Sequence, residues 1–355
     1  MDTLLSPRRR ALLQALGAAA LVAGCGERRG ASASPLLEFR GPTMGTAFTA
    51  KIAGAGMPEA RAGAARDAVA GAFDSVVAKM STYLPDSELS RFNRHAAGTP
   101  FALSAETIAV LALARQVSAA SGGAFDITVA PLVDAWGFGP VKAHRVVPDA
   151  EASALAARVG WRGIAVDASA GAATKSHADL RADLSGIAKG FGVDQAARAL
   201  EALGIDDYMV EAGGEVRTRG RNAEGRPWRI AIERPDATPQ RPHFVVPLSG
   251  LSMATSGDYR IFFEQGGRRY SHEIDPVAGR PIRHGLASVS VVAPECGYAD
   301  AMATALIVMG PDDGYALAAS RDIAAHFIVR EPGGSLRDRQ TPAFAALGGA
   351  PFPDV

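Results

Sequence analysis

Cysteine is scarce in this chain of 355 residues, which contains only Cys25 and Cys296. Cys25 is predicted below to carry a different modification, so Cys296 has no partner within the chain and no disulfide framework is expected. We therefore expect Cys296 to be a buried free thiol. The folded part must then be stabilised by its core, and a hydrophobic content of 48% is sufficient for one in a chain of this length.

Excess charge of either sign is also lacking. The 37 Lys and Arg residues balance the 37 Asp and Glu residues, and the basic residues do not gather into one stripe. Nucleic-acid-binding domains present such a stripe, so we expect no nucleic-acid partner. Cysteine and histidine do not cluster at zinc-binding spacing, and no GxSxG or GxGxxG motif follows a predicted strand.

A hydrophobic run long enough to cross a bilayer is missing as well. The apolar segment near the N-terminus, residues 11–24, has 14 residues, whereas a membrane-spanning helix needs about 20. Arg8-Arg9-Arg10 precede it, an order typical of a secretory signal. Val22-Ala23-Gly24-Cys25 resembles a bacterial lipobox, whose cysteine is lipidated and becomes the new N-terminus. The alternative is an ordinary buried helix. Arg9-Arg10 before Ala11-Leu12-Leu13 also resembles a twin-arginine export signal.

These features divide the chain into a signal peptide, a lipidated cysteine with a flexible tether, one folded domain and a tail, at residues 1–24, 25–38, 39–345 and 346–355. The Pro- and Gly-rich stretch from 331 onward is expected to be loosely held. We expect the mature protein to be exported and anchored through Cys25 at the periplasmic face of the bacterial cell membrane.

Helical and strand patterns alternate through the folded domain. Helices are predicted at 58–80, 105–121, 149–159, 188–203, 298–309 and 312–320. Ser104 is the predicted N-cap of the second helix, and Gly122-Gly123 its end. Strands are predicted at 45–52, 161–167, 207–211, 215–219, 228–233, 243–248, 268–274, 286–293 and 323–329. Because several strands cluster as hairpins, we expect a mixed α/β (α+β) fold with partly antiparallel sheets flanked by helices.

The segment Asp183–Gly192 is the first place where chemistry is expected. It lies where a strand-like run gives way to a helix that starts near Ile187. Helix N-termini and glycine-rich backbone present N–H groups to anions, and Lys189 adds a positive charge. The alternative is a capped turn with a solvated lysine.

Asp300 and Thr304 form a second candidate site. They are four residues apart on a predicted helix, so their oxygen atoms project from the same face. A carboxylate with a hydroxyl suits Mg²⁺, whose other ligands are usually waters and substrate phosphates. The alternative is that Asp300 caps the helix and Thr304 bonds back to a carbonyl.

His272 follows a predicted strand and has polar neighbours, so it is a candidate proton acceptor near neutral pH. Asp275 is a candidate assistant. Three further segments combine glycine or small residues with aromatic ones, as a site for a flat ring requires: 42–46, 81–93 and 123–139.

Taken together and in order, these segments resemble the ApbE-like family of FAD:protein FMN transferases over most of residues 40–310. The motifs that carry the resemblance are Met44-Gly45-Thr46, Tyr83 with Ser87–Asn93, Phe125–Thr128, Asp183–Gly190, Gly213-Gly214, Thr255–Tyr259, Ser271-His272 with Ile274–Pro276, and Ala299-Asp300 with Thr304. Exported lipoproteins are common in this family. Two departures lie near His272: Glu273 replaces a usually apolar residue, and Val277-Ala278 replaces a basic residue and threonine.

The resemblance implies a compact fold that holds FAD in a cleft, with Mg²⁺ at its pyrophosphate. It implies that the FAD contacts are Met44, Tyr83, Ala124, Phe125, Asp126, Asp183, Lys189 and Ile274. It also implies that Asp300, Thr304 and the Gly186 carbonyl hold the metal.

The implied activity is Mg²⁺-dependent transfer of FMN from FAD, through a phosphodiester, to a threonine or serine of an acceptor redox protein, with release of AMP. Implied acceptors are subunits of sodium-pumping NADH:quinone reductase (Nqr) or Rnf-type complexes. Two alternatives stay open. One is a FAD pyrophosphatase that releases FMN and AMP, and the other is a non-catalytic FAD-binding lipoprotein.

Overall fold

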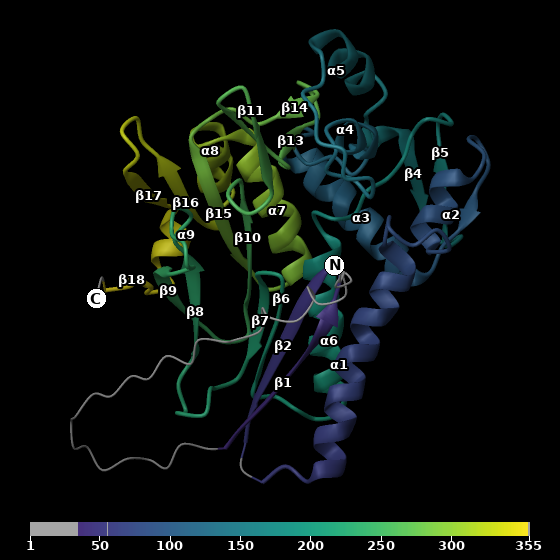
Figure 1. Ribbon diagram of the computed structural model, residues 1–355. Coiled ribbons are helices and arrows are strands. Elements are labelled where there is room, and N and C mark those ends of the chain that lie inside the picture. The colour runs from purple at the N-terminus through teal and green to yellow at the C-terminus, as the bar shows by residue number, and fades with distance from the viewer. Residues whose placement is uncertain (1–34, 55, 354–355) are drawn as a thin grey trace, which may run out of the picture. The chain divides into compact units, whose positions relative to one another are not determined.

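An eight-stranded sheet joins segments from both ends of the described chain (Figure 1). All its neighbouring strands are antiparallel. In spatial order they are β1 (Leu36–Thr43), β2 (Thr46–Ala53), β6 (Tyr208–Ala212), β7 (Glu215–Arg219), β10 (Ser252–Gly257), β15 (Leu286–Ala293), β16 (Ala324–Arg330) and β17 (Leu336–Gln340). The sheet therefore brings residues that are far apart in the sequence onto neighbouring strands.

This computed structural model describes residues 35–54 and 56–353, which belong to one unit of the chain, Ala33–Val355. The predicted signal peptide, Cys25 and residues 26–34 lie outside the described residues. Among the helices in the described part, none is long and apolar enough to span a membrane.

The two faces of the large sheet pack against different layers, and side-chain alternation shows this on β16. Ala325, Phe327 and Val329 belong to the buried cluster that includes the helices. Ile328, between them, belongs to the cluster formed with a smaller sheet. Successive side chains of a strand point to opposite faces, so a strand covered on both sides is buried along its length and is mostly apolar. The same condition explains why every residue of β15 is buried.

Helices cover one face of the large sheet. The long helix α1 (Glu59–Met80) packs against α6 (Ala188–Ala202), and α6 packs against α7 (Cys296–Met309). α7 in turn lies on β10 and β15 and contacts α3 (Ala105–Ala120) and α8 (Asp313–Ser320). α7 is therefore surrounded by other elements, and most of its residues are buried.

The opposite face carries a three-stranded sheet of β8 (Trp228–Glu233), β9 (Pro242–Leu248) and β18 (Ala350–Pro351). The other strands are β3 (Phe101–Ala102), β4 (Ile164–Asp167) and β5 (Ala172–Lys175), the hairpin β11 (Phe262–Gln265) with β12 (Arg268–Ser271), and the pair β13 (Ile274–Asp275) and β14 (Arg280–Pro281). The short helices are α2 (Glu88–Arg94), α4 (Ala130–Ala135), α5 (Asp149–Ala156), the 3-10 helix η1 (Trp161–Gly163) and α9 (Pro342–Ala345).

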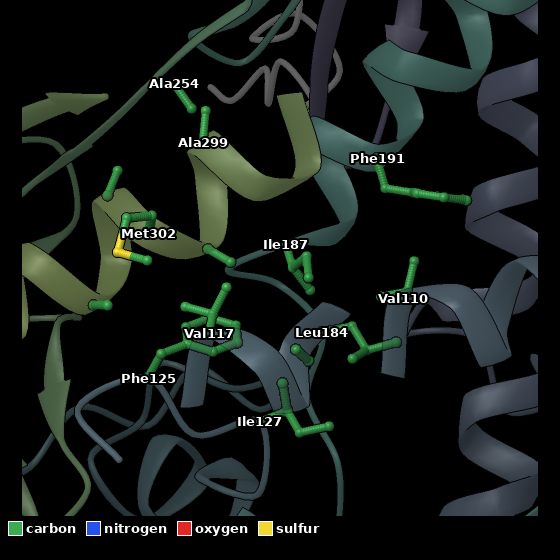
Figure 2. Close-up of a cluster of buried hydrophobic side chains, with 14 of the residues drawn as sticks. Val110, Val117, Phe125, Ile127, Leu184, Ile187, Phe191, Ala254, Ala299 and Met302 are labelled. Atoms are coloured by element: carbon green, nitrogen blue, oxygen red, sulfur yellow. The ribbon is translucent and has the colours of Figure 1, made fainter. Parts of the chain in front are cut away.

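The largest buried cluster joins α3 and α7 to two of the predicted functional segments. Figure 2 shows Val117 of α3 beside Phe125, with Leu184 and Ile187 nearby and Met302 on α7. Each of these side chains is almost fully buried. The apolar residues within the functional segments thus anchor these segments in the core. This packing also fixes the positions of the polar residues next to them.

The predicted mixed fold is confirmed, and most predicted elements occur close to their expected bounds. The predicted cap of α3 is present, because the Ser104 side chain accepts a hydrogen bond from the Thr107 N–H. Cys296 is a buried free cysteine, as expected. The strand β10 was not predicted, since its small and hydroxylated residues, Ser-Met-Ala-Thr-Ser-Gly, lack a strong strand pattern.

Three expectations differ from the structure. β1 begins at Leu36, inside the predicted tether 25–38, because its residues pair along the whole of β2. Residues 331–353 are not loosely held: they form β17, α9 and β18, and Phe344 is buried in the core. The predicted strand 268–274 is broken in two. β12 ends at Ser271, paired with Phe262, and β13 begins at Ile274, paired with Pro281.

Candidate active site

Helices α6 and α7 approach each other so closely that their contact requires glycine. A Cβ atom at Gly190 would lie 2.4 Å from the Cys296 carbonyl oxygen and 2.8 Å from the Asp300 Cβ. Glycine therefore allows the first turn of α6 to rest on α7. The Gly190 N–H donates a 2.9 Å hydrogen bond to Asp300 Oδ2. This contact holds the Asp300 carboxylate beside the N-terminus of α6.

Lys189 lies between two buried carboxylates. Its Nζ is 2.7 Å from Glu215 Oε1 and 3.9 Å from Asp300 Oδ1. Burial disfavours the ammonium, but Asp300 and Glu215 outweigh burial and raise the pKa of Lys189 above its usual value. The alternative of a solvated lysine therefore does not fit. We refer to Lys189, Glu215 and Asp300 as the Lys189 cluster.

The two carboxylates of the Lys189 cluster are buried, and yet few groups donate hydrogen bonds to them. Burial raises the pKa of Glu215 to about 7, although Lys189 opposes the rise. Burial likewise raises the pKa of Asp300, opposed by Lys189 and by the Gly190 N–H. The Glu215 Oε2 atom is buried and has no hydrogen-bond partner among the described residues. Buried ionisable groups with perturbed pKa values are typical of functional sites.

Thr304 lies one turn after Asp300 on α7. Glu295 is the N-cap residue of α7, and the Asp300 carboxylate reaches across to α6 instead, so Asp300 does not cap its helix. Thr304 Oγ1 is 3.2 Å from Ser256 Oγ on β10. A Cβ atom at Gly186 would lie 3.1 Å from Thr304 Oγ1. The packing thus brings the three residues predicted to hold the metal together from two segments.

The donor atoms of these residues fit Mg²⁺. They comprise one carboxylate, one hydroxyl and one backbone carbonyl, all hard oxygen donors. No three or more His, Cys, Asp or Glu side chains in residues 35–54 and 56–353 are arranged to hold a metal. Mg²⁺ seldom uses such an all-protein cage, because it keeps waters and takes phosphate oxygens as ligands. The absence of nitrogen and sulfur donors does not suit zinc.

His272 lies at the break between β12 and β13. Its backbone N–H donates to the Ile261 carbonyl oxygen at 3.1 Å, and its Nδ1 is 3.2 Å from the same oxygen. The Phe138 ring meets the imidazole edge-on, with centroids 6.4 Å apart. Desolvation lowers the pKa of His272 to about 4. The imidazole is therefore neutral near pH 7 and able to accept a proton.

Two more carboxylates surround His272. Glu273 Oε1 is 3.7 Å from His272 Nε2, and Asp258 at the end of β10 receives a bidentate pair from Arg330 at 2.6 and 2.7 Å. Burial raises the pKa of Glu273 to about 8; Lys189 opposes the rise, and Asp258 and Asp300 add to it. His272 and Glu273 thus lie within electrostatic reach of the Lys189 cluster.

Three predicted site carboxylates hold turns. Asp126 Oδ1 accepts from the Thr128 N–H and hydroxyl, and its Oδ2 accepts from the Trp161 N–H. Asp183 Oδ1 accepts from the Ser185 N–H at 2.8 Å. Asp275 Oδ1 accepts from the N–H groups of the two residues that begin the next turn, Val277 and Ala278. These contacts give all three a structural role, and their predicted roles toward FAD or the proton stay predictions.

The remaining predicted contacts lie around these groups. Met44 has φ +47° in the tight turn between β1 and β2, and its Cε would be 2.6 Å from a Cβ at Gly192 on α6. Tyr83 is 58% exposed. Lys142 Nζ lies 3.4 Å from the Tyr83 hydroxyl and donates a 2.8 Å hydrogen bond to the Phe138 carbonyl oxygen. Phe125 and Ile274 are buried and Ala124 is half-buried, and their predicted contacts with FAD stay predictions.

The sequence interpretation missed Glu215. The only signal was its place after Gly213-Gly214. Gly213 has φ +67°, and a Cβ there would lie 3.3 Å from Glu215 Oε2 and 3.4 Å from Lys189 Cδ. A glycine is needed to turn the chain while leaving room for both side chains. The partner of Glu215 comes from a different element, so its role could not be seen from spacing.

A pocket of 470 Å³ lies on another side of α6 and α7, and its lining includes none of the predicted site residues. It is lined by Ala109, Leu113, Phe191, Asp194, Arg198, Pro294, Glu295 and Tyr298. Tyr298 and Asp300 are two residues apart on α7 and therefore project from different faces of the helix.

The chain is similar in sequence and in fold to proteins of one known family. The model of the ApbE family matches residues 44–327. An FAD:protein FMN transferase of Haemophilus influenzae is 44% identical over 306 residues, which are 84% of this chain and 88% of that protein. A counterpart from Vibrio cholerae is 41% identical over 324 residues, 91% of this chain and 94% of that protein. The solved structure of the flavin transferase ApbE from Vibrio cholerae has a TM-score of 0.80 and 39% identity, and the match covers 88% of this chain and 99% of that one.

Proposed function

Because the chain belongs to the ApbE family, we propose that it is an FAD:protein FMN transferase, which moves the FMN half of FAD onto an acceptor protein. The observation that carries the proposal is the Lys189 cluster, with Thr304 beside it and His272 within electrostatic reach. Cleaving a pyrophosphate needs positive charge near the phosphates and a base near the attacking hydroxyl, and this arrangement supplies both. The names of the similar enzymes support the same activity.

In the proposed reaction, a threonine or serine hydroxyl of the acceptor attacks the phosphorus atom of the FMN half. A new P–O bond forms to the acceptor, and the P–O bond to AMP breaks. The hydroxyl proton moves to Nε2 of His272. AMP leaves with the electron pair of the broken bond. The product is a phosphodiester between FMN and the acceptor side chain.

Asp300, Thr304 and the Gly186 carbonyl are the residues that would hold Mg²⁺. When bound, this ion offsets negative charge on the phosphates. Lys189 adds a second positive charge from the N-terminus of α6, where backbone N–H groups also favour anions. The Glu215 carboxylate keeps the Lys189 ammonium in place, because the two are ion-paired at 2.7 Å.

The proposed FAD contacts are Met44, Tyr83, Ala124, Phe125, Asp126, Asp183, Lys189 and Ile274. Their combination of apolar surface and polar groups suits a flavin ring joined to a diphosphate.

The proposed acceptors are subunits of membrane redox complexes of the Nqr or Rnf type. We further propose that the chain is exported, with the twin arginines as one route, and that lipid on Cys25 holds it at the periplasmic face. An anchored enzyme would meet its membrane-bound acceptor in two dimensions, which raises their effective concentration.

The test uses the chain from residue 26 onward, incubated with FAD, Mg²⁺ and a domain bearing a candidate acceptor threonine. Mass spectrometry should detect the mass of FMN less one water on the acceptor, with AMP in solution and both products lost when EDTA is added. A Thr→Val acceptor is the matched control and should stay unmodified.

Two other outcomes would replace the proposal. Free FMN and AMP with an unmodified acceptor would identify a FAD pyrophosphatase. Intact bound FAD, with no turnover at any Mg²⁺ concentration, would identify a carrier.

A further inference from the structure

We propose that Glu273 is a positioning residue for His272, whose carboxylate stabilises the imidazolium that forms when Nε2 takes the proton of the acceptor hydroxyl. The inference rests on the proposed flavin transfer. It follows from the pairing of the chain around the break, the burial of Glu273 and its shortage of hydrogen-bond donors.

The break between β12 and β13 decides which imidazole nitrogen is basic. The Ile261 carbonyl oxygen lies 3.2 Å from His272 Nδ1. A carbonyl only accepts hydrogen bonds, so Nδ1 carries the hydrogen in the neutral ring. Nε2 is then the unprotonated nitrogen, and Glu273 Oε1 lies 3.7 Å from it. At this distance the carboxylate acts on the ring through its charge, and the Nε2 lone pair stays free to take the proton of the acceptor hydroxyl.

Glu273 is held in place by its backbone and by burial. Its carbonyl oxygen accepts a hydrogen bond of 2.9 Å from the Ile282 N–H. The side chain is 8% exposed, against 33% for His272. His272 is thus open to a substrate on one side while Glu273 is covered by protein on the other.

Glu273 differs from the buried carboxylates that stabilise the fold. Asp126 accepts hydrogen bonds from two N–H groups and a hydroxyl, and Asp258 accepts from both ends of the Arg330 guanidinium. Nothing in the described part of the chain donates a hydrogen bond to the Glu273 carboxylate. A buried carboxyl without donors lowers stability. Its presence is explained if the side chain acts on the neighbouring imidazole.

The charges around Glu273 come from three other elements as well as from His272. Lys189 on α6 favours the carboxylate, while Asp258 at the end of β10 and Asp300 on α7 disfavour it. Together with burial, these groups raise the pKa of Glu273 to about 8. The carboxylate becomes available as the pH rises through this value. The turnover rate of the wild-type enzyme should therefore rise through about pH 8.

The experiment measures kcat and KM for FAD between pH 6 and pH 10, with the acceptor saturating. In Glu273→Gln we expect kcat above pH 8 to fall by about tenfold or more, because one charge beside the imidazolium is lost. The rise near pH 8 should disappear, and KM for FAD should change less than about twofold. Glu264→Gln is the matched control, because this glutamate lies on the neighbouring β11 and its side chain is 66% exposed.

Glu273→Met guards against a variant that merely fails to fold. Replacing a buried, donor-poor carboxyl by an apolar side chain of similar size should leave the melting temperature equal or higher. A stable Met variant with low kcat would support the positioning role. Wild-type kcat with an unchanged rise near pH 8 in either variant would overturn it. A wild-type enzyme that transfers no FMN would instead overturn the proposed function, whatever the variants do.

Discussion

The two helices α6 and α7 meet in two places that handle buried charge in opposite ways. At one contact, Asp194 of α6 accepts hydrogen bonds from the Cys296 and Gly297 N–H groups of α7, each at 2.9 Å, and from Arg217 at 2.6 Å. At the other, Asp300 accepts one hydrogen bond from α6, and Glu215 Oε2 accepts none from the described residues.

The difference separates a structural clamp from a reactive site. Around Asp194 the donors satisfy both carboxylate oxygens and oppose the rise in the pKa of Asp194 that burial causes, so little hydrogen-bonding capacity is left for a ligand. Around Lys189 the carboxylate oxygens can accept more hydrogen bonds than the protein donates to them. This shortage of donors reduces stability, but it leaves oxygen atoms free to bind a ligand. The same pair of helices thus provides rigidity at one contact and chemistry at the next.

The largest effect is expected from Asp300→Ala. We expect flavin transfer to fall by at least about 10⁴-fold, because the predicted metal loses its only carboxylate. The melting temperature should change by only a few degrees, since just one hydrogen bond is lost. AMP release and thermal unfolding measure the two effects. Asp312→Ala, which removes an exposed carboxylate, is the control; wild-type turnover in Asp300→Ala would refute the metal assignment.

Asp194→Ala should mainly lower stability, whereas Asp300→Ala should mainly lower turnover. It leaves Arg217 without its buried partner and two N–H groups of α7 without acceptors, so we expect the free energy of unfolding to fall by about 3–5 kcal/mol. Urea denaturation followed by circular dichroism measures this. A loss below about 1 kcal/mol would mean that Asp194 is not a clamp, and the comparison between the two contacts would fail.

The stability of the protein should depend on pH through Glu273. The pKa of Glu273 is about 8 in the folded protein, against 4.5 for an unburied glutamate. A raised pKa means that the folded state keeps a proton that the unfolded state releases. The stability linked to Glu273 is therefore complete below about pH 4.5, falls as the pH rises to 8, and is lost above it.

We expect this loss to be roughly 5 kcal/mol, because each pKa unit corresponds to about 1.4 kcal/mol. Urea denaturation at each pH from 4.5 to 9 measures it, and Glu273→Gln should show a smaller slope. Identical slopes in the wild type and the variant would show that Glu273 does not keep its proton in the folded state.

The smallest effect is expected from Asp275→Ala. Its carboxylate holds two N–H groups of the next turn, so we expect a loss of about 1 kcal/mol in stability. Turnover should stay within about twofold of the wild type if the role is only structural. A tenfold fall in kcat with an altered pH profile would instead support the predicted assistance to His272.

Much of the fold could be predicted from the sequence wherever the residues of a single helix or strand form a regular pattern. The helices α1 and α3 follow a regular apolar pattern, and Ser104 marks the start of α3. β10 could not be predicted, because its small and hydroxylated residues are buried only through their place in the sheet. β17 and β18 were missed for a related reason: their pairing with β16 and β9 compensates for a sequence rich in proline and glycine.

The same distinction applies to the candidate site: pairs within one helix could be predicted, and pairs between elements could not. Asp300 and Thr304 could be paired from spacing, because residues four apart share a helix face. The partner of Lys189 could not, because Glu215 lies on β7 and meets Lys189 only when α6 packs beside that strand. The break between β12 and β13 at His272 could not be predicted either, because residues 268–274 have the composition of one continuous strand.

The class of fold, the order of the functional motifs and the family resemblance could be recognised from the sequence alone, because they depend on local patterns and on the identity and spacing of residues along the chain. Which buried carboxylates are saturated with hydrogen-bond donors, and which are not, could be seen only once the elements were packed together. That distinction depends on contacts such as the Gly190 N–H with Asp300 and the Arg217 guanidinium with Asp194. Contacts of this kind join separate elements, and their energies depend on burial that exists only after the elements have packed together.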